Sequence, residues 1–248
     1  MHKPGWIRKF HKPGTSGSPP LLIFPHAGAG ASTYRKFSKA FSAHFDVIVF
    51  QYPGRQDRAS EPLPVSLPDI ASGALHEFIG SAFHRSTPIY TFGHSMGALV
   101  SFEFVRMAEA AGIDVRLLTV AAAVPPCRAD TRPRTPTGDE DLLDHLAMLE
   151  GTGGDVLGNR EIMRLALPVL QADHRACDAY SGPADARLRA AVHALGGDRD
   201  PIVSVADLHG WRKHAADTEV SVFEGGHFFH NDHIDAIAES TAGIAGSG

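Results

Sequence analysis

The amino-acid sequence predicts an α/β fold, with a mostly parallel sheet flanked by helices and one helical insertion. Short apolar runs bounded by turn residues alternate along the chain with longer segments of helical periodicity. That alternation implies crossover connections between parallel strands, whose carboxyl ends are the usual place for a ligand. One interval, residues 124–185, has no strand candidate and interrupts the alternation. We therefore expect a helical segment inserted between two strands of the sheet.

Length and composition favour one domain. The chain has 248 residues, of which 43% are hydrophobic, enough for a sizeable core. We expect a single domain over residues 1–248, in which residues 1–19, basic and rich in Pro and Gly, form a flexible tail. This tail lacks the apolar stretch of a signal peptide, and no apolar run reaches the roughly 20 residues that span a bilayer. These features predict a cytoplasmic protein without a membrane partner.

Charge and cysteine content exclude further classes. The net charge of −5 comes without a long basic stripe, which argues against a nucleic-acid partner. The cysteines, Cys127 and Cys177, lie far apart and have no metal-ligand spacing, so we expect free thiols in a reducing compartment. A basic cluster at Arg128, Arg132 and Arg134 is either a solvated loop or a docking patch for an acidic partner.

The expected strands are short apolar runs that end in turn residues. They are LLIF (21–24), VIVF (47–50), PIYTFG (88–93), RLLTVAAA (116–123), AAVHALGG (190–197) and EVSVF (219–223). Helical periodicity covers 33–44, 68–83 and 96–112. In the last of these helices Leu99, Val100 and Phe104 share the buried side, and Gly112 has the position of a C-terminal stop.

The insertion at 124–185 carries helical apolar stripes. Leu142, Leu143, Leu146 and Leu149 form one stripe, and Ile162, Leu165 and Ala166 form another. Pro168 should kink or restart the second helix, because it has no amide hydrogen to donate. The insertion is either extra helical packing that never moves or a cap over the active face. We favour the cap, since LPVL and ACDAY have enough apolar surface to line a pocket.

The sequence Gly93-His94-Ser95-Met96-Gly97 follows an expected strand and leads directly into a helix. This is the G-x-S-x-G pattern in the context that indicates a nucleophile. The turn from strand to helix is so tight that the residues two before and two after the serine must be small, as Gly93 and Gly97 are. We therefore predict that the Ser95 hydroxyl projects above the sheet edge as a catalytic nucleophile.

A serine nucleophile needs a base and an orienting acid, which in this fold class follow in the order acid, then histidine. His227 lies after the strand EVSVF, across Gly225 and Gly226, at the same sheet edge as Ser95. Asp198 and Asp200 both follow the strand before it, and the residues alone do not separate them. His230 and His233 are expected at the start of the last helix, with a metal site as an alternative that their rotation around a helix makes unfavourable.

The oxyanion of an acyl-transfer intermediate needs backbone N–H donors. Met96, directly after the nucleophile, is one candidate. The other is Ala27 in the glycine-containing loop FPHAGAG (24–30), where the neighbouring His26 could orient the loop or be a partly buried histidine without a role.

Several blocks in order resemble one family, the type II (external) thioesterases of nonribosomal peptide and polyketide synthases, which have the α/β-hydrolase fold. The resemblance covers roughly residues 20 to 240. It rests on FPHAGAG, QYPGRQDR (51–58), GHSMGALVSFE (93–103), LPVLQADHRACDAY (167–180), GGDRDPIVS (196–204), Trp211 and GGHFFH (225–230). QYPGR distinguishes this family from generic lipases and esterases. The chain departs from the family pattern in HAGAGAS, which lacks a second consecutive glycine, and at His174, where an aromatic residue is common.

The resemblance implies a function and a set of residues. It implies Asp200 as the acid, His227 as the base, Met96 and Ala27 as oxyanion donors and a helical lid over residues 124–185. It further implies hydrolysis of acyl thioesters on acyl or peptidyl carrier proteins, without cofactor or metal, in secondary metabolism such as siderophore or antibiotic biosynthesis. Phe228 and Phe229 should pack the base in place. Candidate substrate contacts are His26, Met96, Leu170 and Phe228, and we expect a monomer.

Other functions use the same residues. A broad carboxylesterase or a short-chain acyl-CoA thioesterase would have the same triad. A preference for carrier-bound over free substrates would distinguish a type II thioesterase from both. A carrier-binding module on an inactive hydrolase fold would need no triad, although every member is present here.

Overall fold

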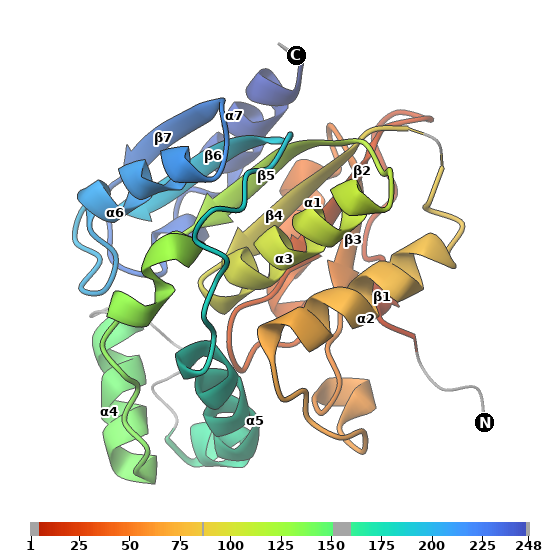
Figure 1. The fold of residues 1–248 in the computed structure, drawn as a ribbon. Coiled ribbons are helices and arrows are strands. Elements are labelled where there is room, and N and C mark those ends of the chain that lie inside the picture. Colours follow the sequence, from red (N-terminus) through yellow and green to blue (C-terminus); the bar gives the residue numbers. More distant parts are fainter. Residues whose placement is uncertain (1–4, 86, 151–159, 247–248) are drawn as a thin grey trace.

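The computed structural model describes residues 5–85, 87–150 and 160–246, which form a sheet covered by helices on both faces (Figure 1). The sheet has seven strands in the order β1-β3-β2-β4-β5-β6-β7. All neighbours pair in parallel except β1 and β3, so the expected α/β fold is confirmed. The strands are β1 (Ile7–Arg8), β2 (Pro20–Phe24), β3 (Asp46–Phe50), β4 (Ile89–His94), β5 (Val115–Ala121), β6 (Ala191–Gly197) and β7 (Thr218–Phe223).

Helices connect these strands. They are α1 (Arg35–Phe41), α2 (Leu67–Ile79), α3 (Met96–Ala110), α4 (Asp139–Glu150), α5 (Arg160–Asp178), α6 (Val205–His209) and α7 (Ile234–Gly246). Short 3-10 turns occur at Ala31–Tyr34, Gln56–Arg58, Pro126–Thr131, Gly210–Lys213 and Phe229–Asn231. Within the described residues, no helix is both long and apolar enough to cross a membrane.

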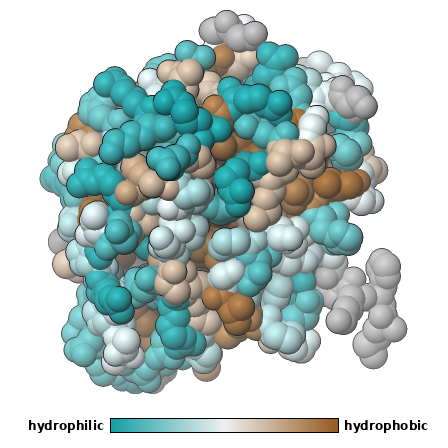
Figure 2. Space-filling view, in the orientation of Figure 1, coloured by the Kyte–Doolittle hydropathy of each residue, from teal (hydrophilic) through white to brown (hydrophobic). Residues whose placement is uncertain are grey.

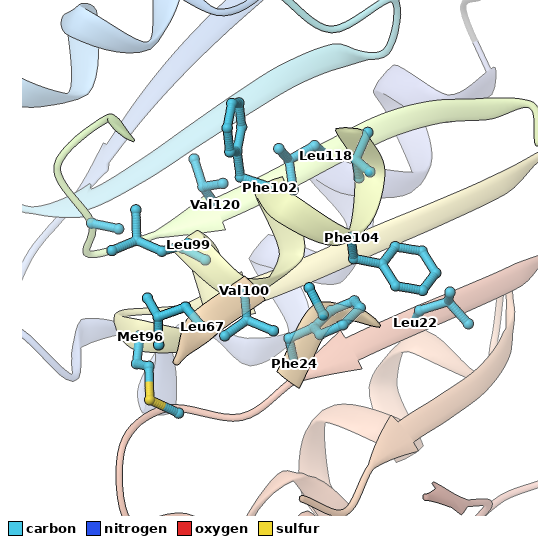
Figure 3. Packing of buried hydrophobic residues seen from close by; sticks show 14 of the residues in the cluster. Leu22, Phe24, Leu67, Met96, Leu99, Val100, Phe102, Phe104, Leu118 and Val120 are labelled. Atoms are coloured by element: carbon cyan, nitrogen blue, oxygen red, sulfur yellow. The ribbon is translucent and has the colours of Figure 1, made fainter. Parts of the chain in front are cut away.

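Side-chain alternation along the strands divides the core into two layers. Leu22 and Phe24 of β2 face α2 and α3, whereas Leu21 and Ile23 face α1 and α7. Successive residues of a strand point to opposite faces, so a strand that is apolar throughout contributes to both layers. Figure 3 shows the first layer, in which α3 packs on the sheet through Met96, Leu99, Val100, Phe102 and Phe104.

The N-terminal segment differs from the expected flexible tail. Ile7 and Arg8 pair with β3 as an antiparallel edge strand. Trp6 packs against the core and lies so close to Gly73 of α2 that a Cβ there would collide with its ring, while the Arg58 guanidinium lies 4.7 Å from that ring. The segment is ordered by contacts with distant residues, which its own composition does not reveal.

The insertion contains α4 and α5, which pack side by side beyond one end of the sheet (Figure 1). The stripe of Leu142, Leu143, Leu146 and Leu149 is buried against α5 as expected. On α5 the expected stripe is wrong at Leu165, which is 84% exposed; Leu167 and Leu170 are buried instead. Ile162 lies outside the residues whose side chains are described. α5 continues through Pro168, so this proline does not restart the helix.

The outer surface is mixed in character. On the face drawn in Figure 2, hydrophobic residues form separate groups among hydrophilic ones. Most of the described large apolar side chains are in the core, and the exceptions include Val65 and Leu165.

Candidate active site

Ser95 lies on a strained turn between β4 and α3. Its φ of 54° and ψ of −119° are unusual for a residue other than glycine. The turn is possible because Gly93 and Gly97 have no side chains: a Cβ at Gly97 would collide with the Phe24 carbonyl, and one at Gly93 with the Gly97 carbonyl. The requirement for small residues that the sequence predicts thus has a direct steric cause.

The structure brings Ser95, His227 and Asp200 together from three loops at the carboxyl ends of the strands. His227 Nε2 lies 3.0 Å from Ser95 Oγ, and His227 Nδ1 lies 2.9 Å from Asp200 Oδ2. With its Nδ1–H donated to the carboxylate, His227 keeps Nε2 free to accept the serine proton. Burial alone would raise the pKa of Asp200, but the hydrogen bond and charge of His227 and the amides of Ile202 and Val203 outweigh burial and lower it.

Asp198 lies two residues away and faces elsewhere. Its Oδ1 accepts the N–H of Gly225 at 2.8 Å, and its Oδ2 is 3.3 Å from the exposed Arg199. Asp198 therefore joins the two loops, while Asp200 contacts the imidazole. The geometry separates two carboxylates that the residues alone left equivalent.

Ala27 and Met96 line the same cavity as Ser95 and His227. Next to Ala27, the Tyr34 hydroxyl lies 2.8 Å from His26 Nδ1 and accepts the His26 main-chain N–H at 3.3 Å. Burial, with the charges of His227 and Arg55, lowers the pKa of His26 to about 3, so this histidine is neutral. These contacts with Tyr34 hold the loop that carries Ala27.

The cavity beside Ser95 has a volume of about 60 Å³ and lies under the insertion. Of the four expected substrate contacts, only Met96 is among the described residues that line this cavity. Leu170 packs in the core between α4 and α5. Phe228 packs against that core and against the rings of His26 and His227. The sequence does not mark most of the polar lining as part of the site, because these side chains come from separate parts of the insertion and meet above the sheet only in the folded chain. Arg132 and His174 stand out in the sequence for other reasons, and the remaining polar lining residues in the insertion are Thr135, His145 and Asp178. Larger open depressions beside α7 and the starts of β4 and β5 do not include Ser95.

A group of buried histidines lies behind the base. His94 Nε2 lies 2.9 Å from the His227 carbonyl oxygen, and the His94 and His230 rings are 3.9 Å apart between centroids. Burial, with neighbouring histidines, lowers the pKa of both His94 and His230 far below the ordinary value. His230 therefore differs from the expected residue at a helix start: it is 2% exposed and packs in the core. His233 Nε2 is hydrogen-bonded to the Glu224 carbonyl oxygen. Among the described residues, no group of three or more His, Cys, Asp or Glu side chains is arranged to bind a metal ion.

Comparison with known proteins places these features in context. A family model described as a thioesterase domain matches residues 19–244. The chain is 40% identical over 235 residues to phenyloxazoline synthase MbtB of Mycobacterium tuberculosis, a match that covers 94% of this chain and only 16% of the synthase. It is 34% identical over 234 residues to thioesterase PikA5 of Streptomyces venezuelae, covering 94% of this chain and 82% of PikA5. The structure of the type II thioesterase BorB, from the borrelidin biosynthetic cluster, matches with a TM-score of 0.87 at 35% identity, covering 98% of this chain and 99% of BorB.

Proposed function

The chain belongs to the thioesterase family, and we propose that it is a type II thioesterase that hydrolyses acyl thioesters on phosphopantetheinyl carrier proteins of a nonribosomal peptide or polyketide synthase. The hydrogen-bond chain from Ser95 through His227 to Asp200 carries the proposal, because it supplies a nucleophile, a base and an orienting acid within one site. The likeness to PikA5 and BorB over most of their lengths supports the substrate class.

In the proposed reaction, Ser95 Oγ attacks the thioester carbonyl while His227 Nε2 takes its proton. The Met96 and Ala27 amides stabilise the oxyanion, each contributing on the order of 3 kcal/mol to lowering the barrier. The C–S bond then breaks, and His227 returns the proton to the departing pantetheine thiol. Water attacks the acyl-serine with His227 again as base, which releases the acid and restores Ser95. Asp200 holds the imidazole tautomer and stabilises the imidazolium throughout.

The size of the cavity supports a short acyl group. Its volume of about 60 Å³ is small beside the roughly 300–1,000 Å³ of a typical ligand pocket. A short acyl chain on a carrier is what an editing enzyme removes when a synthase has been loaded with the wrong unit. The cavity lies beneath α4 and α5, so the insertion would serve as the lid that shapes the acyl site.

The test uses a carrier protein loaded with an acetyl or butyryl group. Wild type should release the acyl group, whereas Ser95→Ala should not, and a fluorophosphonate should label wild type only. The same acyl groups on coenzyme A and on simple oxygen esters provide the comparison. Faster cleavage of the oxygen esters than of the carrier thioesters would contradict the proposal and support a broad carboxylesterase.

A further inference from the structure

The loop that carries Ala27 is held at both ends by consecutive residues of the QYPGR segment, for which the reaction above assigns no task. Gln51 Oε1 accepts the Ala31 N–H at 2.7 Å, and the Tyr52 hydroxyl donates to the Pro25 carbonyl at 3.3 Å. Gln51 and Tyr52 are fully buried. The two ends of the loop are therefore fixed to the segment that follows β3.

The middle of the loop is bonded to the insertion. The carboxylate of Asp173, in α5, accepts the Gly28 N–H at 2.8 Å. Arg55, the last residue of QYPGR, holds the same carboxylate through two hydrogen bonds of 2.9 Å, and its guanidinium lies 5.2 Å from the Tyr52 ring. Asp173 is 1% exposed and Arg55 5% exposed. A bidentate pair fixes the orientation of the carboxylate as well as its position.

A second contact joins α5 to the same point of the loop. Gly28 has a φ of +77°, and a Cβ there would collide with Leu170 Cδ2. Glycine permits both this backbone conformation and the close approach of the helix. α5 therefore meets the loop through a polar and an apolar contact at the residue next to Ala27.

We propose that Asp173 is a positioning residue for the oxyanion hole. Oriented by Arg55, its carboxylate fixes the Gly28 amide and thereby the adjoining Ala27 amide. The packing of α5 against the loop and the alignment of the Ala27 N–H are therefore coupled. This inference rests on the proposed function, in which the Ala27 N–H stabilises the oxyanion. Arg55 and Asp173 are both buried, so removing either one alone would leave an unpaired buried charge on the other.

The test compares two double variants that both lack the buried charges. Arg55→Met/Asp173→Leu leaves the Gly28 N–H without an acceptor, whereas Arg55→Met/Asp173→Asn keeps an amide oxygen at nearly the same place. The substrate is acetyl-pantetheine, so that carrier docking plays no part. Loss of a whole oxyanion donor costs about 10²–10³-fold in kcat. We expect the leucine variant to have a kcat about 10–100-fold below that of the asparagine variant, with similar KM.

The affinity for phenylboronic acid, which forms a tetrahedral adduct with the serine, provides a second measurement. A change in fold stability alone would not alter this affinity. This affinity should be weaker for the leucine than for the asparagine variant, in parallel with kcat, at a temperature well below both melting points. Equal kcat and equal boronate affinity in the two variants would overturn the proposal. If the leucine variant does not fold, Arg55→Met/Asp173→Ala makes the same comparison. If wild type hydrolyses acetyl groups only on a carrier protein, the same kcat comparison is made with that substrate; failure to hydrolyse it as well would count against the proposed function, while the boronate comparison would still test the role of Asp173.

Discussion

Replacing Asp200 by asparagine should remove nearly all thioester hydrolysis and leave the fold intact. Asp200 Oδ1 accepts the N–H groups of Ile202 and Val203 at 2.8 and 3.1 Å, and an asparagine oxygen preserves both bonds. The other oxygen, 2.9 Å from His227 Nδ1, becomes an NH₂ group. His227 must then accept at Nδ1 and carry its proton on Nε2, where it can no longer take the proton of Ser95. The corresponding change in serine proteases lowers kcat about 10⁴-fold, or about 5 kcal/mol of barrier.

The matched control is Asp198→Asn in the same loop. Asparagine keeps an oxygen for the Gly225 N–H, and the lost ion pair with Arg199 is exposed, so kcat should stay within about threefold of wild type. The assay is steady-state hydrolysis of acetyl-pantetheine, with thermal unfolding to show that both variants are folded. Equal losses of kcat in the two variants would refute the assignment of Asp200 as the acid.

Three further predictions concern stability and the turn at Ser95. Burial lowers the pKa of His193 to about 4, so below about pH 6.5 the unfolded chain binds a proton that the folded protein excludes. The contribution of neutral His193 to the free energy of unfolding is fully present above about pH 6.5 and falls by about 3 kcal/mol as the pH approaches 4. His193→Gln removes this titration, so the variant should unfold at a lower pH than wild type when followed by circular dichroism. An unchanged midpoint pH would count against this prediction. Gly97→Ala should abolish fluorophosphonate labelling, because its Cβ meets the Phe24 carbonyl; normal labelling would show that the turn tolerates a side chain. Leu142→Ala, at a fully buried position, should destabilise the α4–α5 pair by about 2–4 kcal/mol and speed hydrogen exchange there, whereas unchanged exchange would mean that the pair is held by other contacts.

The parts of the fold that local pattern determines agree closely with the structure. The expected strands 21–24, 47–50 and 219–223 correspond to β2, β3 and β7, and the expected helix 96–112 corresponds to α3. Apolar runs between turn residues, and helical spacing, are properties of neighbouring residues. The tight turn at Ser95 was predictable for the same reason, since the glycines that it requires are two residues away on either side.

The choice between Asp198 and Asp200 shows where local pattern stops. Both aspartates follow β6 in the same loop, and resemblance to a family selected Asp200 where spacing could not. The difference lies in the direction of each side chain, which depends on the positions of Gly225 and His227 in another loop. The same limit explains His230, which resembles a surface histidine in sequence and is buried by packing on His94 and Phe37.

What the sequence determined by itself is the order of the elements and the candidates for nucleophile and base, because each is specified by residues a few positions apart. What only the tertiary structure decided is how the loops and the insertion meet above the sheet. Arg55 and Asp173 are separated by 118 positions, and Gly28 and Asp173 by 145. No periodicity or spacing links residues so far apart. They come together because the strands bring their loops to one edge of the sheet, where the buried charges of Arg55 and Asp173 need each other and nearby polar groups as partners.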